Sequence, residues 1–448
     1  MKKVSRRALL ALILAFVLLA GTGWFTVNWA VQSRNWIFFP GSPHMYENGR
    51  LARCSLTDRH GTVLLQRDGA ATYAADGALR AAAMHLVGDP TGNIPEVFTR
   101  TFLRDLVDFE TAEGLHGKPM PQLRLTVSGP VQTAALEALE GRKGTVGVYN
   151  YKTGEILCAV TSPTYDPLDA PDIAGDTTGM WDGVYVNRFI NAAYVPGSVF
   201  KLVTAAAALE TLPDAADRRF DCTGEMAFGV DKVICAGEHG QPDLQEALAR
   251  SCNCAFAQLA LELGPETLTA YAEKLGVAAS FSFDGIVTKA GQFDLSVPVD
   301  VNVAWAGIGQ YTDLVSPLGF LRYMGVIAGG GAAAEPYLVS SAGSYRAEPR
   351  RTEQLLSPET AATLQAYMEQ NVQTVYGAGH FPDLTVCAKS GTAETGEGMT
   401  PHATFAGFCA DPEYPLAFFA VVEHGGAGSA VCAPIIGRVL EACTRMPQ

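Results

Sequence analysis

The sequence has few positive charges. Its 32 lysine and arginine residues are outnumbered by 46 aspartate and glutamate residues, which gives a formal net charge of −14. After the first few residues, no cluster of lysine or arginine occurs along the chain. Nucleic-acid-binding proteins need such clusters because contacts to phosphate supply much of their affinity. We therefore expect no nucleic-acid partner.

Cysteine is also sparse, with ten residues in a chain of 448. A small disulfide-stabilised scaffold would have more cysteines per residue. No Cys-x-x-Cys pair is present and no histidine cluster accompanies the cysteines, so we expect no zinc site, no other metal and no cofactor. Cys222 and Cys235 close a short glycine-rich loop. Two readings stay open for this pair, a disulfide and two buried free thiols.

Charge is absent from residues 8–32, a run long enough to cross a bilayer as a helix. Basic residues precede this run, and a basic flank stays on the cytoplasmic side of the membrane. We expect a cytoplasmic tail over residues 1–7, a single transmembrane anchor over residues 8–32, and an extracytoplasmic remainder. A cleaved signal peptide is the alternative, although no good small-x-small cleavage site ends the apolar run.

Residues 33–122 offer no candidate for chemistry and are predicted to form a short N-terminal stem module. Within them, residues 55–65 indicate two strands joined by a turn, and residues 78–87 indicate a short helix. The expected role of such a module is to hold the next domain away from the membrane or to bind a partner.

Residues 123–448 are predicted to form one α+β domain with an all-helical middle. Strand patterns come first and last, so the sheet should be assembled from both ends of the domain. The expected strands are residues 144–151, 155–160, 385–388, 404–409 and 416–423. The expected helices between and after them are residues 198–212, 244–263, 265–275 and 433–444.

The strongest candidate nucleophile is Ser198, which follows a Pro-Gly turn and begins a long apolar run. Lys201 follows three residues later, so a helix places its amine on the same face as the serine hydroxyl. An adjacent base is one way to activate a weak alcohol nucleophile. Ser198 is the only serine in the chain with a lysine three residues on, but a capped helix with a surface lysine would give the same pattern.

Two further motifs follow at intervals of 53 and 138 residues: Ser251-Cys252-Asn253 and Lys389-Ser390-Gly391-Thr392. Each is weak alone, because Ser33-Arg34-Asn35 and Lys152-Thr153-Gly154 match the same patterns. The first of these two alternatives lies beside the predicted anchor, and the second lies in a predicted hairpin turn before the serine. The set with Ser251-Cys252-Asn253 and Lys389-Ser390-Gly391-Thr392 is therefore the one that places each motif at the start of a predicted helix or the end of a predicted strand.

In this order the three motifs resemble the active-site set of penicillin-binding proteins and serine β-lactamases. The flanking segments are similar to the transpeptidase domain of class B penicillin-binding proteins, and Asp58-Arg59-His60-Gly61 resembles the N-terminal module of that class. The similar flanks are residues 144–167, Asn187-Arg188, Gly307-Ile308-Gly309-Gln310, Ser316-Pro317-Leu318 and residues 402–423. The resemblance covers nearly the whole chain beyond the anchor. It implies a five-stranded antiparallel sheet flanked by helices plus an all-helical subdomain.

The resemblance also implies a role for each motif residue. Ser198 would attack the penultimate D-Ala of a stem peptide, with Lys201 as its base. Ser251 would relay a proton to the leaving D-Ala, and Asn253 would hold a substrate amide and Lys201. The remaining motif would bind the substrate carboxylate and help to form the oxyanion hole, through Lys389, Ser390, Gly391 and Thr392.

The function implied is a peptidoglycan D,D-transpeptidase of the bacterial cell membrane that binds β-lactams covalently. No segment resembles a glycosyltransferase, so the expected protein partner is a membrane glycosyltransferase of the shape-elongation-division-sporulation family. Two alternatives stay open: a hydrolase of the carboxypeptidase or β-lactamase type, and a non-catalytic sensor or activator. The stem is short for the class, which separates this chain from members with a full pedestal module.

Overall fold

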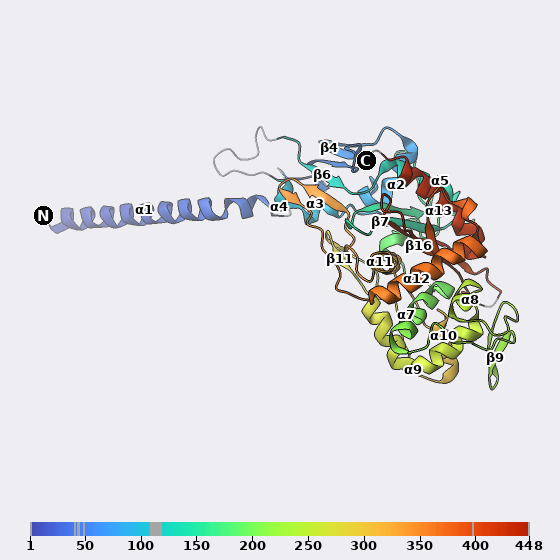
Figure 1. Ribbon diagram of the computed structural model, residues 1–448. Coiled ribbons are helices and arrows are strands. Elements are labelled where there is room, and N and C mark those ends of the chain that lie inside the picture. The colour runs from blue at the N-terminus through green and yellow to red at the C-terminus, as the bar shows by residue number, and fades with distance from the viewer. Residues whose placement is uncertain are drawn as a thin grey trace.

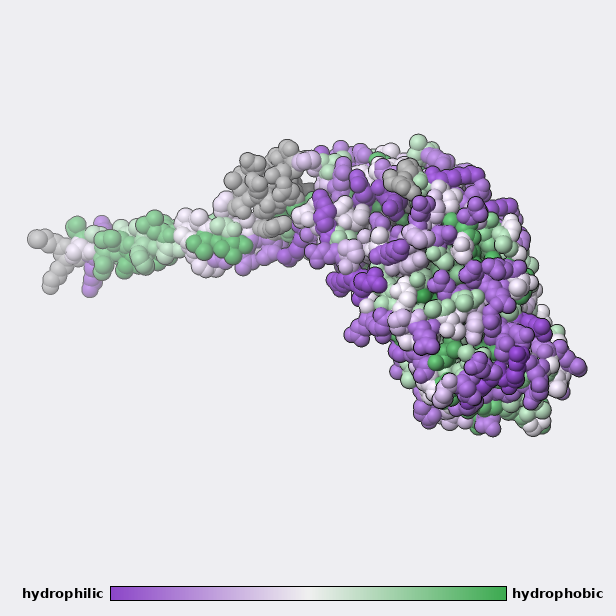
Figure 2. All heavy atoms as spheres, viewed as in Figure 1, coloured by the Kyte–Doolittle hydropathy of each residue, from purple (hydrophilic) through white to green (hydrophobic). Residues whose placement is uncertain are grey.

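The computed structural model describes residues 2–39, 42, 45–47, 50–107, 119–396 and 398–446. Met1 of the predicted tail and residues 108–118 of the predicted stem lie outside the described residues. The first helix, α1 (Lys2–Ile37), projects from the remainder of the molecule as a single rod (Figure 1). Within the described residues, Lys3–Ser33 is the one helical stretch long and apolar enough to cross a membrane. Its apolar side chains are exposed along the rod, as Figure 2 shows.

A five-stranded antiparallel sheet forms the centre of the large domain. Its strands lie in the order β15, β16, β17, β7, β8, so that the C-terminal strands pair directly with the N-terminal ones. Most residues in these strands are buried, as expected when helices cover both faces of a sheet. The bounds are β7 Gly144–Asn150, β8 Ile156–Ser162, β15 Val386–Ala393, β16 His402–Cys409 and β17 Leu416–Val422. The prediction of a sheet assembled from both ends of the domain is confirmed.

Helices cover the two faces of this sheet. Alternate side chains of each strand enter two separate apolar clusters, because successive residues of a strand point to opposite faces. One cluster includes the helices α5 (Gly129–Leu139) and α13 (Gly428–Thr444). The other includes α11 (Pro317–Ala328).

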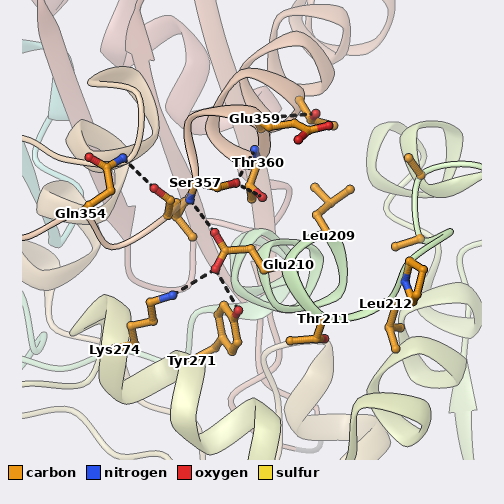
Figure 3. A pocket seen from close by; sticks show the side chains of 15 residues that line it. Leu209, Glu210, Thr211, Leu212, Tyr271, Lys274, Gln354, Ser357, Glu359 and Thr360 are labelled. Atoms are coloured by element: carbon orange, nitrogen blue, oxygen red, sulfur yellow. Dashed lines mark hydrogen bonds and ion pairs between the residues drawn. The ribbon is translucent and has the colours of Figure 1, made fainter.

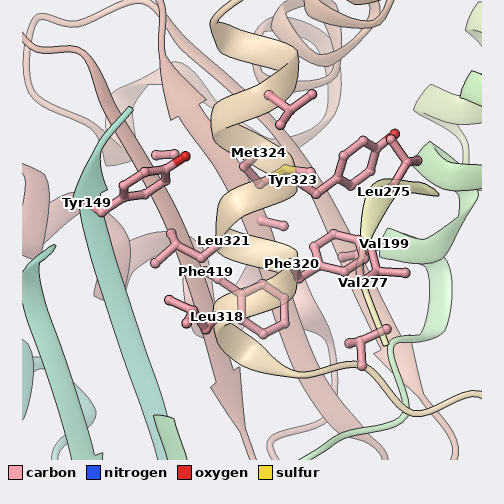
Figure 4. Close-up of a cluster of buried hydrophobic side chains, with 14 of the residues drawn as sticks. Tyr149, Val199, Leu275, Val277, Leu318, Phe320, Leu321, Tyr323, Met324 and Phe419 are labelled. Carbon is pink, nitrogen blue, oxygen red and sulfur yellow. The ribbon is translucent and has the colours of Figure 1, made fainter. Parts of the chain in front are cut away.

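The helix α11 joins the sheet to the helical part of the domain. Phe320 lies against Phe419 of β17 with ring centroids 5.4 Å apart, and the Tyr323 hydroxyl donates a hydrogen bond of 2.8 Å to the carbonyl oxygen of Leu202 (Figure 4). Both side chains are buried, so α11 fixes the helix that carries Lys201 relative to the sheet.

A helical lobe lies beyond α11, at the end of the molecule away from α1 (Figure 1). Its helices are α7 Lys201–Thr211, α8 Leu244–Ala249, α9 Asn253–Leu275 and α10 Asp300–Gly307. The predicted continuous helix over residues 244–263 is wrong, because Ser251 has a φ of 55° and ends α8 before α9 begins. The expected break near residue 264 is a kink at Gly264 inside α9.

The other described elements are shorter or lie at the edges of these layers. They are β1 Tyr46–Glu47, β2 Arg50–Leu51, α2 Gly77–Val87, α3 Phe98–Thr101, α4 Leu103–Leu106, α6 Arg188–Asn191, η1 Gly197–Phe200, β9 Glu225–Phe228, β10 Asp231–Ile234, β11 Ser282–Phe283, β12 Ile286–Val287, α12 Pro358–Asn371, η2 Val372–Tyr376 and η3 Ala378–His380.

The predicted stem contributes three strands to a second sheet, which also contains strands from later in the chain. This six-stranded sheet has the order β14, β13, β6, β3, β4, β5. Its strands are β3 Arg53–Thr57, β4 Val63–Asp68, β5 Ala70–Tyr73, β6 Gln122–Leu125, β13 Val339–Ala342 and β14 Tyr345–Arg346. The sheet therefore crosses the predicted boundary at residue 122. This long-range pairing was not visible in the sequence.

Asp58 connects the β3–β4 turn to the large domain. Its buried carboxylate accepts hydrogen bonds from the backbone N–H groups of His60 at 2.9 Å and Thr62 at 2.8 Å. It also accepts one from the N–H of Gly129 at 3.0 Å, where α5 begins. One side chain thus stabilises the turn and holds it against a helix of the large domain.

We expect Asp58→Ala to lower the free energy of unfolding by roughly 2 kcal/mol or more, because three N–H groups lose their acceptor. Urea unfolding of the full chain in detergent measures the change. The matched control is Asp68→Ala on β4, whose carboxylate forms an exposed ion pair with Arg53 and should matter by less than about 0.5 kcal/mol. Equal effects of the two substitutions would contradict the connecting role of Asp58.

Candidate active site

Ser198 lies in the short 3-10 turn η1, directly before α7. The preceding glycine makes this turn possible, because Gly197 has a φ of 57° and a Cβ there would lie 2.6 Å from the carbonyl oxygen of Thr392. The Ser198 side chain does not cap the helix, so the capped-helix reading is wrong. Its hydroxyl is half-buried and lies 3.0 Å from the Nζ of Lys201.

The Lys201 amine is the meeting point of the site. Besides Ser198, its Nζ contacts the Asn253 Oδ1 at 2.6 Å, the Ser251 carbonyl oxygen at 2.8 Å and the Ser251 Oγ at 3.1 Å. It also lies 5.6 Å from the centre of the Phe256 ring. The residues of the first two motifs, 50 positions apart, are therefore within hydrogen-bonding distance of one atom.

Burial of the Lys201 side chain holds the pKa of its amine well below the usual lysine value. The nearby Lys389 ammonium lowers this pKa further by like-charge repulsion, and neighbouring cysteines oppose the shift. An uncharged amine is the form that can accept a proton, so the structure places a candidate base beside the Ser198 hydroxyl.

The Ser251-Cys252-Asn253 motif occupies the connection between α8 and α9. Ser251 has a left-handed backbone, and Asn253 is the first residue of α9. The Asn253 Nδ2 donates a 2.7 Å hydrogen bond to the carbonyl oxygen of Ile234, which fixes its Oδ1 toward Lys201. The motif is thus held from the side of the β9–β10 hairpin.

The Lys389-Ser390-Gly391-Thr392 motif lies within β15, which continues to Ala393. The strand expected over residues 385–388 is longer in the structure, and the motif forms its end. Gly391 permits the close approach of the serine turn, since a Cβ there would overlap the Thr404 hydroxyl and lie 2.8 Å from the carbonyl oxygen of Pro196. The turn carrying Ser198 therefore sits directly against the strand.

Lys389 is buried, and its Nζ lies 3.2 Å from the Ser251 Oγ and 2.8 Å from the carbonyl oxygen of Ser390. Burial lowers the pKa of its amine to about 7. Ser251 thus lies between two lysines, and all three predicted motifs converge on it.

Tyr376 also belongs to this site, although no sequence motif includes it. Its buried hydroxyl lies 3.5 Å from the Nζ of Lys389 and accepts a 3.1 Å hydrogen bond from the N–H of Ser390. The contact is long-range, since Tyr376 comes from the π-helical turn η2 and no local pattern marks it.

The two alternative motif matches lie elsewhere. Ser33-Arg34-Asn35 is part of α1, and Lys152-Thr153-Gly154 forms the turn between β7 and β8. Among the described residues, the converging set is the one predicted from motif order.

Comparisons with known proteins agree with this geometry. Residues 144–441 match the family described as the penicillin binding protein transpeptidase domain. This chain belongs to that family. A Peptidoglycan D,D-transpeptidase PbpA from Mycolicibacterium smegmatis is 30% identical over 390 residues, covering 77% of this chain and 76% of the relative. A protein of the same name from Mycobacterium tuberculosis is 29% identical over 377 residues, with the same coverage.

Solved structures place the chain among class B penicillin-binding proteins. A D,D-transpeptidase domain from Eggerthella lenta aligns with a TM-score of 0.75 at 27% identity, over 87% of this chain and 97% of that one. Penicillin-binding protein A from M. tuberculosis, solved as a ceftriaxone acyl-enzyme complex, aligns with a TM-score of 0.74 at 25% identity, over 87% and 98% of the two chains. The predicted family and fold are confirmed.

A separate pocket of about 720 Å³ lies at the far end of α7 in this penicillin-binding protein (Figure 3). Glu210 is at its centre and accepts hydrogen bonds from the Ser357 N–H at 2.6 Å and the Tyr271 hydroxyl at 2.9 Å. Lys274 pairs with the same carboxylate at 3.0 Å. The carboxylate is thus engaged in joining α7, α9 and the start of α12, which is a structural role.

Cys222 and Cys235 are both buried free thiols, so the structure agrees with the second of the two readings left open. They do not stand alone. Together with His239 and Cys252 they form a group whose ligand atoms all lie within 4.8 Å of one another. The fold assembles this group without a Cys-x-x-Cys pair, so the spacing of the cysteines along the chain does not decide whether a metal can bind here.

The lowered pKa of Lys389 predicts a pH dependence of stability. The unfolded chain, where lysine has a pKa of about 10.4, binds more protons than the native chain above pH 7, so stability should rise with pH in this window. We expect Lys389→Met to remove up to about 1.4 kcal/mol of this rise per pH unit. Urea unfolding at pH 7, 8 and 9 measures it, and Lys152→Met at the exposed β7–β8 turn is the control. Parallel pH profiles for wild type and Lys389→Met would contradict the lowered pKa.

Proposed function

We propose that this protein is a peptidoglycan D,D-transpeptidase whose nucleophile is Ser198. The observation that carries the proposal is the buried Lys201 amine, which lies 3.0 Å from the Ser198 Oγ and 2.6 Å from the Asn253 Oδ1. Membership in the penicillin-binding protein transpeptidase family supports the reaction class, and the PbpA relatives carry the name of the activity.

The acylation step follows from the contacts of Lys201. In the neutral amine, the Asn253 Oδ1 and the Ser251 carbonyl oxygen accept the two N–H groups, which leaves the lone pair for the Ser198 hydroxyl proton. The Ser198 Oγ attacks the carbonyl carbon of the penultimate D-Ala, and its proton passes to Lys201. The Ser251 hydroxyl, 3.1 Å from Lys201, gives its proton to the amine of the departing terminal D-Ala and takes the proton that Lys201 received. The product is an ester between Ser198 and the stem peptide.

Substrate binding falls to the edge strand β15. Lys389 supplies positive charge for the terminal carboxylate, helped by the hydroxyls of Ser390 and Thr392. The N–H groups of Ser198 and Thr392 form the oxyanion hole, and each donor is worth roughly 3 kcal/mol in such sites. The outer edge of β15 is available to a peptide in extended form, because β15 ends the order of the described sheet.

Transfer to an amine of a neighbouring stem peptide completes the reaction. The amine attacks the ester carbonyl, releases the Ser198 hydroxyl and forms the amide crosslink. A carboxypeptidase or β-lactamase would use water at this step. A sensor would be expected to carry more transmembrane segments and a signalling module, and a non-catalytic activator would have no need of the complete set of motifs. The PbpA names of the relatives favour transfer over hydrolysis.

The proposed location is the cytoplasmic membrane, with α1 as the anchor and the basic N-terminus inside the cell. The catalytic domain would face the peptidoglycan. A membrane glycosyltransferase of the shape-elongation-division-sporulation family is the proposed partner, because residues 144–441 match a transpeptidase domain and polymerisation of the glycan strand is a separate reaction. Residues 33–122 serve as the stem.

We expect the purified full-length chain to form a stable covalent adduct with a fluorescent penicillin and Ser198→Ala to form none, because the ester requires the Ser198 Oγ. Gel fluorescence and intact-mass measurement check both. The control is Ser251→Ala, which keeps the nucleophile and should acylate roughly 10²- to 10⁴-fold more slowly. Labelling that survives in Ser198→Ala would overturn the assignment, and rapid release of hydrolysed penicillin would identify a β-lactamase.

A further inference from the structure

Four side chains beside the active site form a group that the transpeptidase reaction does not use. Three are thiols, of Cys222, Cys235 and Cys252, and the fourth is the imidazole of His239. The three cysteines are buried and the histidine is half-buried. Their ligand atoms all lie within 4.8 Å of one another, although the residues span 30 positions of the chain.

The distances within the group fit one tetrahedral ion. Zinc–sulfur bonds of about 2.3 Å and zinc–nitrogen bonds of about 2.0 Å place two sulfurs about 3.8 Å apart, and a sulfur and a nitrogen about 3.5 Å apart. The Cys235 and Cys252 sulfurs are 3.8 Å apart. The His239 Nδ1 lies 3.5 Å from the Cys222 sulfur and 3.3 Å from the Cys235 sulfur.

Backbone N–H groups already face two of the sulfurs. The N–H of Asn253 lies 3.2 Å from the Cys235 sulfur, and the N–H of Ala255 lies 3.4 Å from the Cys252 sulfur. Both come from the first turn of the 23-residue helix α9, where unpaired N–H groups and the helix dipole favour negative charge. Hydrogen bonds of this kind orient thiolate ligands and balance their charge.

The segment from Cys222 to Gly240 needs such support because it has little apolar core. It contains the hairpin β9–β10, in which most side chains are exposed or half-buried, including Val230 and Ile234. Backbone hydrogen bonds between Cys222 and Gly240 close its base at 2.8 and 3.1 Å. Small segments without a sufficient core are commonly held by a metal or by disulfides.

We propose that Cys222, Cys235, His239 and Cys252 bind a structural zinc ion that joins the hairpin segment to the start of α9 and so positions Ser251 and Asn253. Four protein ligands leave no open position for a substrate or water, so the ion takes no part in the chemistry. The binding site rests on the ligand geometry alone. Its effect on acylation rests on the function proposed above for Ser251 and Asn253.

The positioning role follows from where Cys252 lies in the chain. It separates Ser251, whose left-handed backbone is unfavourable for a residue with a side chain, from Asn253, whose amide donates to the carbonyl oxygen of Ile234. Ile234 is the neighbour of Cys235 on the hairpin. An ion bound by both cysteines would therefore fix the two sides of this hydrogen bond and the backbone of Ser251.

We expect the full-length chain, purified in detergent with a reductant, to contain one zinc ion per molecule by inductively coupled plasma mass spectrometry. Cys222→Ser and His239→Ala should lose most of it, because three ligands bind zinc far more weakly than four. The matched control is Cys443→Ser, a buried thiol on α13 that should keep the zinc. Cobalt replacement should give the visible absorption of a tetrahedral thiolate site in wild type and Cys443→Ser.

The rate of acylation by fluorescent penicillin tests the positioning role of the zinc ion. We expect it to slow roughly 10- to 100-fold in Cys222→Ser, as a small misplacement of catalytic groups does. Cys222→Asp, which restores a ligand atom, should recover zinc and part of the rate whether or not Cys222→Ser folds well. Ser198→Ala should keep its zinc without labelling, which separates failure of the metal site from failure of the proposed function.

Two results would overturn the site. The first is a wild-type chain that contains no zinc and takes up none from added zinc chloride under reducing conditions. The second is mass-spectrometric detection of a native disulfide within the group, between Cys222 and Cys235 or between Cys235 and Cys252. Zinc loss in Cys222→Ser with an unchanged acylation rate would overturn the positioning role.

Discussion

The desolvated amine of Lys201 is the constraint on which the site depends. Removing a lysine from water is costly unless the group gives up its charge or finds partners, and here burial and the neighbouring Lys389 both favour the uncharged form. The partners come from two helices, since Ser198 precedes α7 and both Ser251 and Asn253 lie at the start of α9. The contacts that make Lys201 a candidate base therefore also hold α7 and the start of α9 together.

The sheet completes the site from the other side. The edge strand β15 carries Lys389 to within 3.2 Å of the Ser251 Oγ, and the glycines at 197 and 391 let the serine turn approach the strand backbone closely. Two buried lysines that share one serine repel each other when both are charged, and this repulsion adds to burial in lowering the pKa of Lys201. Ser251 can exchange protons with either side because it lies between them.

Support for Ser251 and Asn253 comes from a part of the molecule with little apolar core. The side chain of Asn253 is tied to the β9–β10 hairpin, whose own residues are largely exposed. The cysteine and histidine group at the base of this hairpin is the element best placed to keep it rigid. In the same way, Asp58 connects the six-stranded sheet to α5, so each of these segments meets the catalytic half through a few buried polar contacts.

Much of the fold and site could be predicted from the sequence by itself. The uncharged run of residues 8–32 determined the apolar helix, since length and composition alone decide whether a helix can span a bilayer. Short apolar strand patterns at both ends of the large domain indicated the sheet. The order of the three motifs indicated which serine and which lysines form the site. These are local signals, and each can be recognised without knowledge of distant contacts.

Only the tertiary structure decided the rest. The mixed six-stranded sheet, the hydroxyl of Tyr376 at Lys389 and the break at Ser251 all depend on contacts between residues far apart in the chain. The group of Cys222, Cys235, His239 and Cys252 is the clearest case, because its members match no metal-binding spacing and meet only when the hairpin folds onto α9. A sequence pattern records which residues are available, whereas coordination and burial depend on where the chain returns in space.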